Sequence, residues 1–188
     1  MKTLILCGYR TAENEEAALG LERDAAGDTL IDRRIHQLRA LGLEAVCVLA
    51  GRGADAQLRG SRLIENAELV FDTADHCSLT SNVRAGAFTL DTQAAFILPV
   101  EIPPPALEIW NYLRNEYGKA GFATPHAFLQ AVSQGAPCHF GFPLLLTRNG
   151  GKLLRESEQM LNLVDPRLQT LQLEYPPEAA LEPSRQAL

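Results

Sequence analysis

The sequence predicts a single α/β domain, Rossmann-like, with a mostly parallel β-sheet and helices on both of its faces. Strand patterns and helix patterns alternate along the chain, which is typical of parallel strands joined by helical crossovers. The expected strands, such as 45–50 and 94–98, are apolar throughout, as strands buried on both faces are. The length of 188 residues suits one hydrophobic core and is short for two.

Each expected element has a local reason. Strands are expected where short apolar runs end at glycine, proline or polar residues, and helices where apolar residues recur at helical spacing. The helix that begins near residue 30 can be capped by Asp28 or Thr29 and can end at Gly42. The expected strands are 3–6, 45–50, 68–71, 94–98, 127–132, 143–147 and 168–173, and the expected helices are 30–41, 80–89, 106–117 and 151–161.

Composition and charge exclude several classes of function. No repeat or linker divides the chain, so we expect one domain over residues 1–188, with a tail, 176–188, that can fray. The net charge is −6 and no basic cluster is present, so we expect no nucleic-acid partner. No apolar run is long enough to cross a membrane, and the opening run is broken at Gly8, so we expect a cytoplasmic protein without a membrane partner.

The four cysteines show no C-x-x-C spacing. Cys7 and Cys47 lie in apolar runs, where a thiol behaves as a small hydrophobic group. The pairs His76–Cys77 and Cys138–His139 could together form a tetrahedral zinc site, although adjacent residues on an extended segment point in opposite directions. Reduced, unconnected thiols are the simpler interpretation.

The first candidate site residue is Glu101, which lies between Pro99 and Pro103 directly after the apolar run 94–98. Ligands of parallel α/β sheets bind at the carboxyl ends of strands, where this glutamate is expected to emerge. A carboxylate in that place can hold Mg²⁺ against a phosphate chain. The alternative is a solvated glutamate in an ordinary strand-to-helix loop.

The long connection after the first strand is the second candidate. Gly8 allows a sharp turn and Arg10 can reach a phosphate, and a loop of this length suggests a functional segment. It contains neither G-x-G-x-x-G nor G-x-x-x-x-G-K-[ST], so it is neither a dinucleotide fingerprint nor a P-loop. The acidic run 13–16 leaves a plain solvated loop as the alternative.

The third candidate is the segment 79–87, where a helix is expected to begin. The hydroxyls of Thr80 and Ser81, together with free backbone N–H groups, could bind a base or an anion. The alternative is that these hydroxyls only cap the helix and that Arg84 is solvated.

Taken in order, six segments resemble the nucleotidyltransferase family that includes the molybdopterin cytidylyl- and guanylyltransferases. The strand 4–8 followed by Arg10 resembles the family's opening strand and first loop. The other matching segments are 27–32 for "G-x-P-L-I", 80–86 for "S-S-L-R-x-G", 98–103 for "L-x-x-D-x-P", 141–145 for "G-H-P-x-x" and 173–178 for "I-D-T-P-E-D".

The resemblance implies the fold of nucleotide-diphospho-sugar transferases and a reaction of molybdenum cofactor biosynthesis. A nucleoside monophosphate passes from a nucleoside triphosphate to a small phosphorylated acceptor, of molybdopterin type or similar, and pyrophosphate is released. Mg²⁺ is the implied cofactor. The implied roles are catalysis by Arg10 and Glu101, metal binding by Glu101 and Glu174, and nucleotide binding by Cys7, Gly8, Arg10, Ser81, Asn82 and Arg84.

Departures from the family pattern keep other functions open. Arg10 stands without a lysine in the first loop, Glu101 and Glu174 replace aspartates, and Phe142 replaces the histidine of "G-H-P". One alternative is a catalytically silent relative that binds a nucleotide or a pterin-like ligand. Another is an interaction or assembly protein. The sequence does not indicate the base, the acceptor or the oligomeric state.

Overall fold

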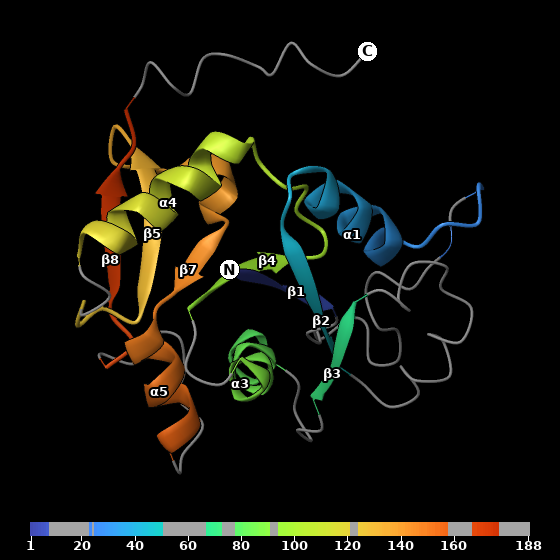
Figure 1. Ribbon diagram of the computed structural model, residues 1–188, viewed down its shortest axis with the longest axis horizontal. Coiled ribbons are helices and arrows are strands. Elements are labelled where there is room, and N and C mark those ends of the chain that lie inside the picture. Colours follow the sequence, from blue (N-terminus) through green and yellow to red (C-terminus); the bar gives the residue numbers. More distant parts are fainter. Residues whose placement is uncertain are drawn as a thin grey trace.

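The computed structural model describes residues 1–7, 23, 25–50, 67–72, 78–90, 94–120, 124–157 and 167–176 (Figure 1). The strands are β1 (Lys2–Cys7), β2 (Glu44–Ala50), β3 (Glu68–Asp72), β4 (Ala95–Pro99), β5 (Phe128–Ser133), β6 (Ala136–Pro137), β7 (Leu144–Leu146) and β8 (Thr170–Glu174). The helices are α1 (Leu30–Ala40), α3 (Leu79–Thr89), α4 (Leu107–Lys119) and α5 (Arg148–Glu156), with a 3₁₀ segment, η2 (Cys138–Gly141).

Every expected strand and helix overlaps an observed one. The last helix differs most, because α5 begins at Arg148 rather than at 151. Thr147 explains the earlier start: its hydroxyl accepts a hydrogen bond from the Gly150 backbone N–H at 3.0 Å and so caps the helix. The short strand β6 is an addition that the sequence did not predict.

The strands form one mostly parallel sheet, as predicted. Its order is β3-β2-β1-β4-β7-β5-β6, and β8 pairs with β5. The pairs among β1, β2, β3 and β4 are parallel, and so is the pair of β5 with β8. Strand β7 runs antiparallel between β4 and β5 and separates the two parallel groups.

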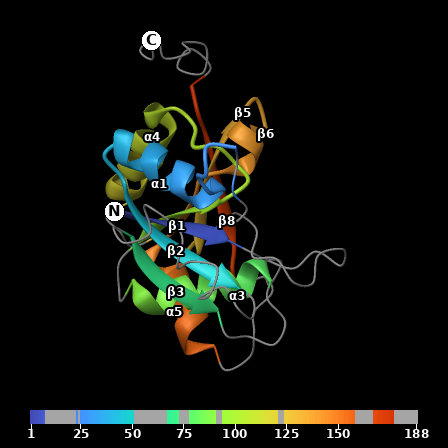
Figure 2. The same cartoon turned by 90° about the vertical axis from the view of Figure 1, so that its right-hand side faces the viewer.

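Helices cover both faces of the sheet. Helices α1 and α4 lie on one face and α3 and α5 on the other, and the two perpendicular views agree (Figures 1 and 2). Alternate residues of β1 serve the two faces. Ile5 and Cys7 belong to the hydrophobic cluster under α1 and α4, whereas Leu4 and Leu6 belong to the cluster under α3 and α5.

Glycines bring α3 and α5 close to the sheet. A Cβ atom on Gly86 of α3 would lie 2.8 Å from Leu4 Cδ1, so α3 can approach β1 only because this residue has no side chain. A Cβ atom on Gly150 of α5 would lie 2.4 Å from the backbone oxygen of Ala127. The glycine of the 80–86 segment therefore has a packing role, because it lets the C-terminal half of α3 lie close to the sheet. None of the helices in the described ranges is long and apolar enough to cross a membrane.

Candidate functional site

The carboxyl ends of β1 and β4 meet at the centre of the sheet. Leu6 is paired with Pro99, and the Val100 N–H continues the ladder by donating to the Leu6 oxygen at 3.0 Å. Glu101 follows at once, with an exposed side chain, beside the point where β1 ends at Cys7. Gly8 and Arg10 come next in the sequence after β1 and lie outside the described residues.

A tight turn presents Glu101. The Ile102 N–H donates to the Pro99 oxygen at 3.1 Å, which closes a β-turn with Val100 and Glu101 at its centre. Arg34 of α1 holds this turn: its Nε donates to the Val100 oxygen at 2.9 Å and its Nη2 to the Glu101 oxygen at 3.3 Å. The sequence did not reveal this role of Arg34, because nothing in its local pattern indicates a partner so distant in the chain.

Arg34 is buried, with only 8% of its surface exposed. Burial lowers its pKa below the ordinary arginine value, Arg33 lowers the pKa further, and the nearby Glu101 raises it. An arginine nevertheless stays protonated in a protein. Its Nη1 also donates to the Gln37 Oε1 at 2.8 Å. The buried guanidinium therefore has hydrogen-bond partners in place of water.

Cys7 was predicted to bind nucleotide, and its side chain lies in the core. Burial raises the pKa of its thiol well above the ordinary value, and Cys47 and Glu101 raise it further. The Sγ donates weakly to the Ile5 oxygen at 3.6 Å. The thiol is therefore a neutral packing group, and only the backbone of Cys7 reaches the edge of the sheet.

Ser81 takes part in capping α3, the alternative weighed for this segment. Its hydroxyl accepts from the Ser78 N–H at 2.8 Å, and the Ser78 hydroxyl accepts from the Ser81 N–H at 3.1 Å. The Ser81 hydroxyl also donates to Asp72 Oδ2, at the end of β3, at 2.5 Å. This network fixes the start of α3 against β3 and occupies the hydroxyl.

Asn82 differs from its neighbour. The residue is completely buried, and neither its side-chain oxygen nor its side-chain nitrogen has a hydrogen-bond partner among the described residues. Buried amides are nearly always paired, because an unpaired one loses its hydrogen bonds to water without replacement. Of the residues predicted in this segment, Asn82 is the one whose side chain has both a donor and an acceptor to offer a ligand.

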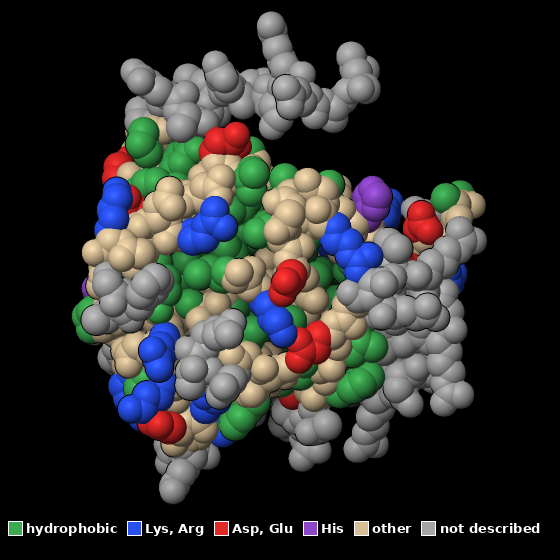
Figure 3. Space-filling view, viewed as in Figure 1, with side chains coloured by type: hydrophobic (Ala, Val, Ile, Leu, Met, Phe, Trp, Pro, Cys, Tyr) green, Lys and Arg blue, Asp and Glu red, His purple; other side chains and the backbone are tan. Residues whose placement is uncertain are grey.

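Arg84 points to a different part of the molecule. Its Nη2 donates to the Ser157 backbone oxygen at 2.9 Å, at the end of α5, and its Cζ lies 5.8 Å from the centre of the Phe88 ring. Lys and Arg side chains gather over α5 at the lower left of Figure 3, where that helix contributes Arg148, Lys152 and Arg155. Arg84 therefore ties α3 to α5.

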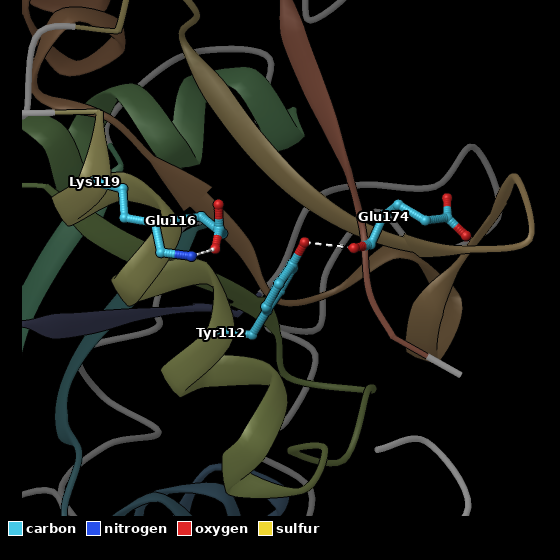
Figure 4. Close-up of polar contacts among 4 residues, drawn as sticks. All are labelled: Tyr112, Glu116, Lys119 and Glu174. Atoms are coloured by element: carbon cyan, nitrogen blue, oxygen red, sulfur yellow. Dashed lines mark hydrogen bonds and ion pairs between the residues drawn. The ribbon is translucent and has the colours of Figure 1, made fainter. Parts of the chain in front are cut away.

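Glu174 is held at the end of β8. Its Oε1 accepts from the Gln134 N–H at 2.6 Å in the β5–β6 turn, and its backbone oxygen accepts from the Tyr112 hydroxyl at 2.6 Å (Figure 4). Strands β7 and β5 lie between β4 and β8, and three strand spacings amount to roughly 14 Å. Glu101 and Glu174 thus lie at the ends of strands of the same sheet that are separated by β7 and β5, and the metal site shared by their carboxylates stays a prediction.

The loop after Glu101 also contacts the 3₁₀ segment. His139 Nε2 lies 2.6 Å from the Pro103 oxygen, and since a carbonyl only accepts, this nitrogen carries the proton. His139 and Phe140 both have positive φ, at 43° and 60°. Phe142, which replaces the family's histidine, is partly buried and packs against both hydrophobic clusters.

Metal ligands are few at this edge. Within the described ranges, no group of three or more His, Cys, Asp or Glu side chains is gathered as a metal cluster. His76 and Cys77, half of the zinc alternative, lie outside those ranges. A single carboxylate still fits Mg²⁺, which proteins commonly hold through one or two carboxylates together with substrate phosphates and water.

Comparisons with known proteins identify the fold. No family model and no curated protein matches the chain. Molybdopterin-guanine dinucleotide biosynthesis protein A from Archaeoglobus fulgidus superimposes with a TM-score of 0.62 at 17% identity, covering 93% of this chain and 83% of that one. The Rv0371c homolog from Mycobacterium sp. strain JC1 gives 0.62 at 14% identity, covering 93% and 85%.

Further solved structures extend this similarity. Bifunctional IspDF from Campylobacter jejuni gives a TM-score of 0.59 at 11% identity, covering 93% of this chain and 49% of that one. UDP-glucose pyrophosphorylase complexed with UDP-glucose gives 0.54 at 12% identity, covering 83% and 79%. The resemblance drawn from the sequence is thus confirmed at the level of the fold: the chain has the α/β fold of these structures.

Proposed function

We propose that this chain is a nucleotidyltransferase that transfers a nucleoside monophosphate from a nucleoside triphosphate to a small phosphorylated acceptor and releases pyrophosphate. The observation that carries the proposal is the exposed Glu101 side chain where the parallel strands β1 and β4 end side by side. Ligands of open α/β sheets bind at this edge. The fold shared with molybdopterin-guanine dinucleotide biosynthesis protein A supports this class of reaction.

Glu101 is the proposed ligand of a divalent metal ion, which we take to be Mg²⁺. The manganese complex of Rv0371c from Mycobacterium tuberculosis, with a TM-score of 0.55, supports a divalent ion in this fold. When bound, the ion would neutralise charge on the phosphates. Glu174 is the second proposed ligand; its Oε1 accepts the Gln134 N–H, which leaves Oε2 to offer to the ion.

Nucleotide binding is assigned to the start of α3 and to the first loop. The buried, unpartnered amide of Asn82 can donate to and accept from the same base or sugar. The Cys7 backbone, Gly8 and Arg10 complete the proposed set. Ser81 and Arg84 belong to the predicted nucleotide-binding set as well, and their contacts with Asp72 and Ser157 also fix α3.

The reaction asks for positioning and charge neutralisation rather than for covalent catalysis. An ionised phosphate oxygen of the acceptor attacks the α-phosphorus and forms a new P–O bond. The bond from the α-phosphorus to the bridging oxygen breaks, and pyrophosphate leaves with the electron pair. No side chain has to remove a proton, and Arg10 is the proposed partner of the leaving phosphates.

The acceptor is proposed to be a molybdopterin-type or similar phosphorylated small molecule. The name of the solved structure from Archaeoglobus fulgidus supports this class. Such an acceptor would give the chain a role in molybdenum cofactor biosynthesis.

A catalytically silent relative is the second candidate function. The observation that favours it is Glu174, whose carboxylate is bound to Gln134 and lies away from Glu101, so the second acid of the family pattern has a structural task. A silent relative would bind a nucleotide or a pterin-like ligand without turnover, or would act through its surface as an assembly factor.

Calorimetric titration with each nucleoside triphosphate, in Mg²⁺ and in EDTA, tests the proposal. We expect Mg²⁺-dependent binding of at least one of them, with pyrophosphate released when the acceptor is added. Arg10→Ala should weaken binding by about ten- to a hundredfold, as a lost charge-assisted contact does. Its melting temperature should stay close to that of wild type, as for most substitutions in a loop.

The outcomes separate the candidates. Binding without pyrophosphate release across phosphorylated acceptors would favour the silent relative. No binding of any nucleotide at millimolar concentration would end the nucleotide proposal. Equal binding by wild type and Arg10→Ala would show that the first loop is not the phosphate site.

A further inference from the structure

The turn that presents Glu101 is held from outside its own strand. Its two central residues, Val100 and Glu101, both have their carbonyl oxygens bound by one side chain, the guanidinium of Arg34. The chain after β4 passes beside α1 before it reaches α4 (Figure 1), which brings these carbonyls within reach of the helix. The turn is thus fixed by a group on a regular helix.

The guanidinium is itself fixed. Gln37, one helical turn further along α1, accepts from Nη1 at 2.8 Å, and Arg34 is buried apart from the 8% of its surface that is exposed. Its hydrogen bonds therefore go to two backbone carbonyls and a neutral amide rather than to a carboxylate. The planar fork of arginine suits this task, since several donors with fixed directions can hold two acceptors at once.

Arg34 also brings a positive charge close to Glu101, which raises the pKa of the guanidinium in return. The backbone contacts set the position of Glu101, while its own carboxylate stays exposed to solvent.

We propose that Arg34 is a positioning residue of the Glu101 site, which holds the Val100–Glu101 turn so that the carboxylate is directed to a divalent metal ion. This inference rests on the proposed function. Groups that orient metal ligands typically change metal affinity by about ten- to a hundredfold when they are removed. Arg34 would act in this way through the backbone of the ligand rather than through its carboxylate.

The first test compares Arg34→Met and Arg34→Lys with Arg114→Met, a change at an exposed arginine of α4 that binds Asn111 of its own helix. For Arg34→Met we expect the Mg²⁺ concentration needed for half-maximal nucleotide binding to rise at least about tenfold. Nucleotide binding at saturating Mg²⁺ should change by less than about twofold, because Arg34 is not a proposed contact of the nucleotide. Arg34→Lys keeps the charge but not the planar set of donors, so its Mg²⁺ requirement should fall between those of wild type and Arg34→Met. Arg114→Met should match wild type.

The second readout is hydrogen exchange of the Ile102 amide without any ligand. Its bond to the Pro99 oxygen closes the turn, so Arg34→Met should speed its exchange while the amides of β1 keep their wild-type rates. Arg34→Lys serves as the folded comparison if Arg34→Met unfolds.

The results distinguish failure of the inference from failure of the proposed function. If wild type binds nucleotide with Mg²⁺ and both Arg34 variants keep the wild-type metal dependence, the inference falls and the function stands. If wild type binds no nucleotide, the proposed function fails. The positioning role of Arg34 then fails as well, whatever the hydrogen-exchange rate of the Ile102 amide is. Unchanged exchange at Ile102 in both variants would likewise overturn the proposed control of the turn.

Discussion

The two halves of the sheet end at the same edge, each in a glutamate, and they use it in opposite ways. In the half built from β1 to β4, the backbone of Glu101 is held by Arg34 and the carboxylate is exposed. In the half built from β5, β7 and β8, the carboxylate of Glu174 accepts the Gln134 N–H, and its backbone oxygen accepts the Tyr112 hydroxyl.

The difference shows what a motif match can and cannot indicate. Both glutamates match acids of the same family pattern and both are exposed, yet the Glu174 carboxylate also accepts a backbone N–H. A carboxylate that accepts a backbone N–H in a turn has a structural task, since its loss would leave that N–H without a partner. We therefore propose Glu101 as the main metal ligand, while Glu174 also supports the β5–β6 turn.

The largest expected effect separates these two acids directly. Glu101→Gln removes the charge without changing the shape, and we expect Mg²⁺-dependent nucleotide binding to weaken by about a hundredfold, the upper range for a lost charged contact. Glu174→Gln keeps an oxygen that can accept the Gln134 N–H, so binding should stay within about twofold of wild type. Calorimetry of both variants measures the contrast, and an equal loss in both would contradict the assignment.

Glycine substitutions sharpen the comparison of the halves through stability. A Cβ atom at Gly150 would meet the backbone of Ala127, which cannot move aside, so Gly150→Ala should lower the free energy of unfolding by about 2–3 kcal/mol. Gly86→Ala should cost about 1 kcal/mol, because the nearest atoms belong to the flexible end of Leu4.

Gly118 is the matched control for these changes. It lies in α4, and a Cβ atom added there would have no atom within 4 Å beyond its own stretch of helix, so Gly118→Ala should raise the free energy of unfolding by up to about 1 kcal/mol. Urea denaturation gives all three values. The packing role of Gly150 would be refuted if Gly150→Ala were as stable as Gly86→Ala or more so.

The smallest expected effect concerns the hydrogen bond that joins α4 to β8. Tyr112→Phe removes the hydroxyl that donates to the Glu174 oxygen and should cost about 0.5–1.5 kcal/mol, as for one hydrogen bond. Nucleotide binding should not change, because this hydrogen bond lies at β8, away from the proposed site at the ends of β1 and β4. Urea denaturation and calorimetry on the same sample test both statements, and weaker nucleotide binding would show that the halves are coupled.

The sequence predicts the half that ends in Glu101 better than the other half. The run 94–98 is apolar and is closed by Pro99, so its strand and the place of Glu101 follow from local pattern alone. The direction of β7 does not follow, because an antiparallel strand of three residues carries no signal that distinguishes it from a parallel one. Together with β5, this strand lies between the strands that lead to Glu101 and Glu174.

Side-chain partners distant in the chain could not be predicted from the sequence either. Arg34 looks like one more polar residue of an amphipathic helix, and its bonds to Val100 and Glu101 exist only once α1 packs on the sheet. The capping role of Ser81, by contrast, depends on residues next to it in the sequence. It could therefore be predicted, and it was expected as an alternative. The unpartnered amide of Asn82 became visible only with the burial of α3.

A crystal structure with Mn²⁺ and a bound nucleoside triphosphate tests the central claim most directly. We predict the ion bound to the Glu101 carboxylate and to phosphate oxygens, with Arg34 still on the Val100 and Glu101 carbonyls and Glu174 still on Gln134. An ion bound at Glu174 but not at Glu101, or a nucleotide bound away from the ends of β1 and β4, would contradict it.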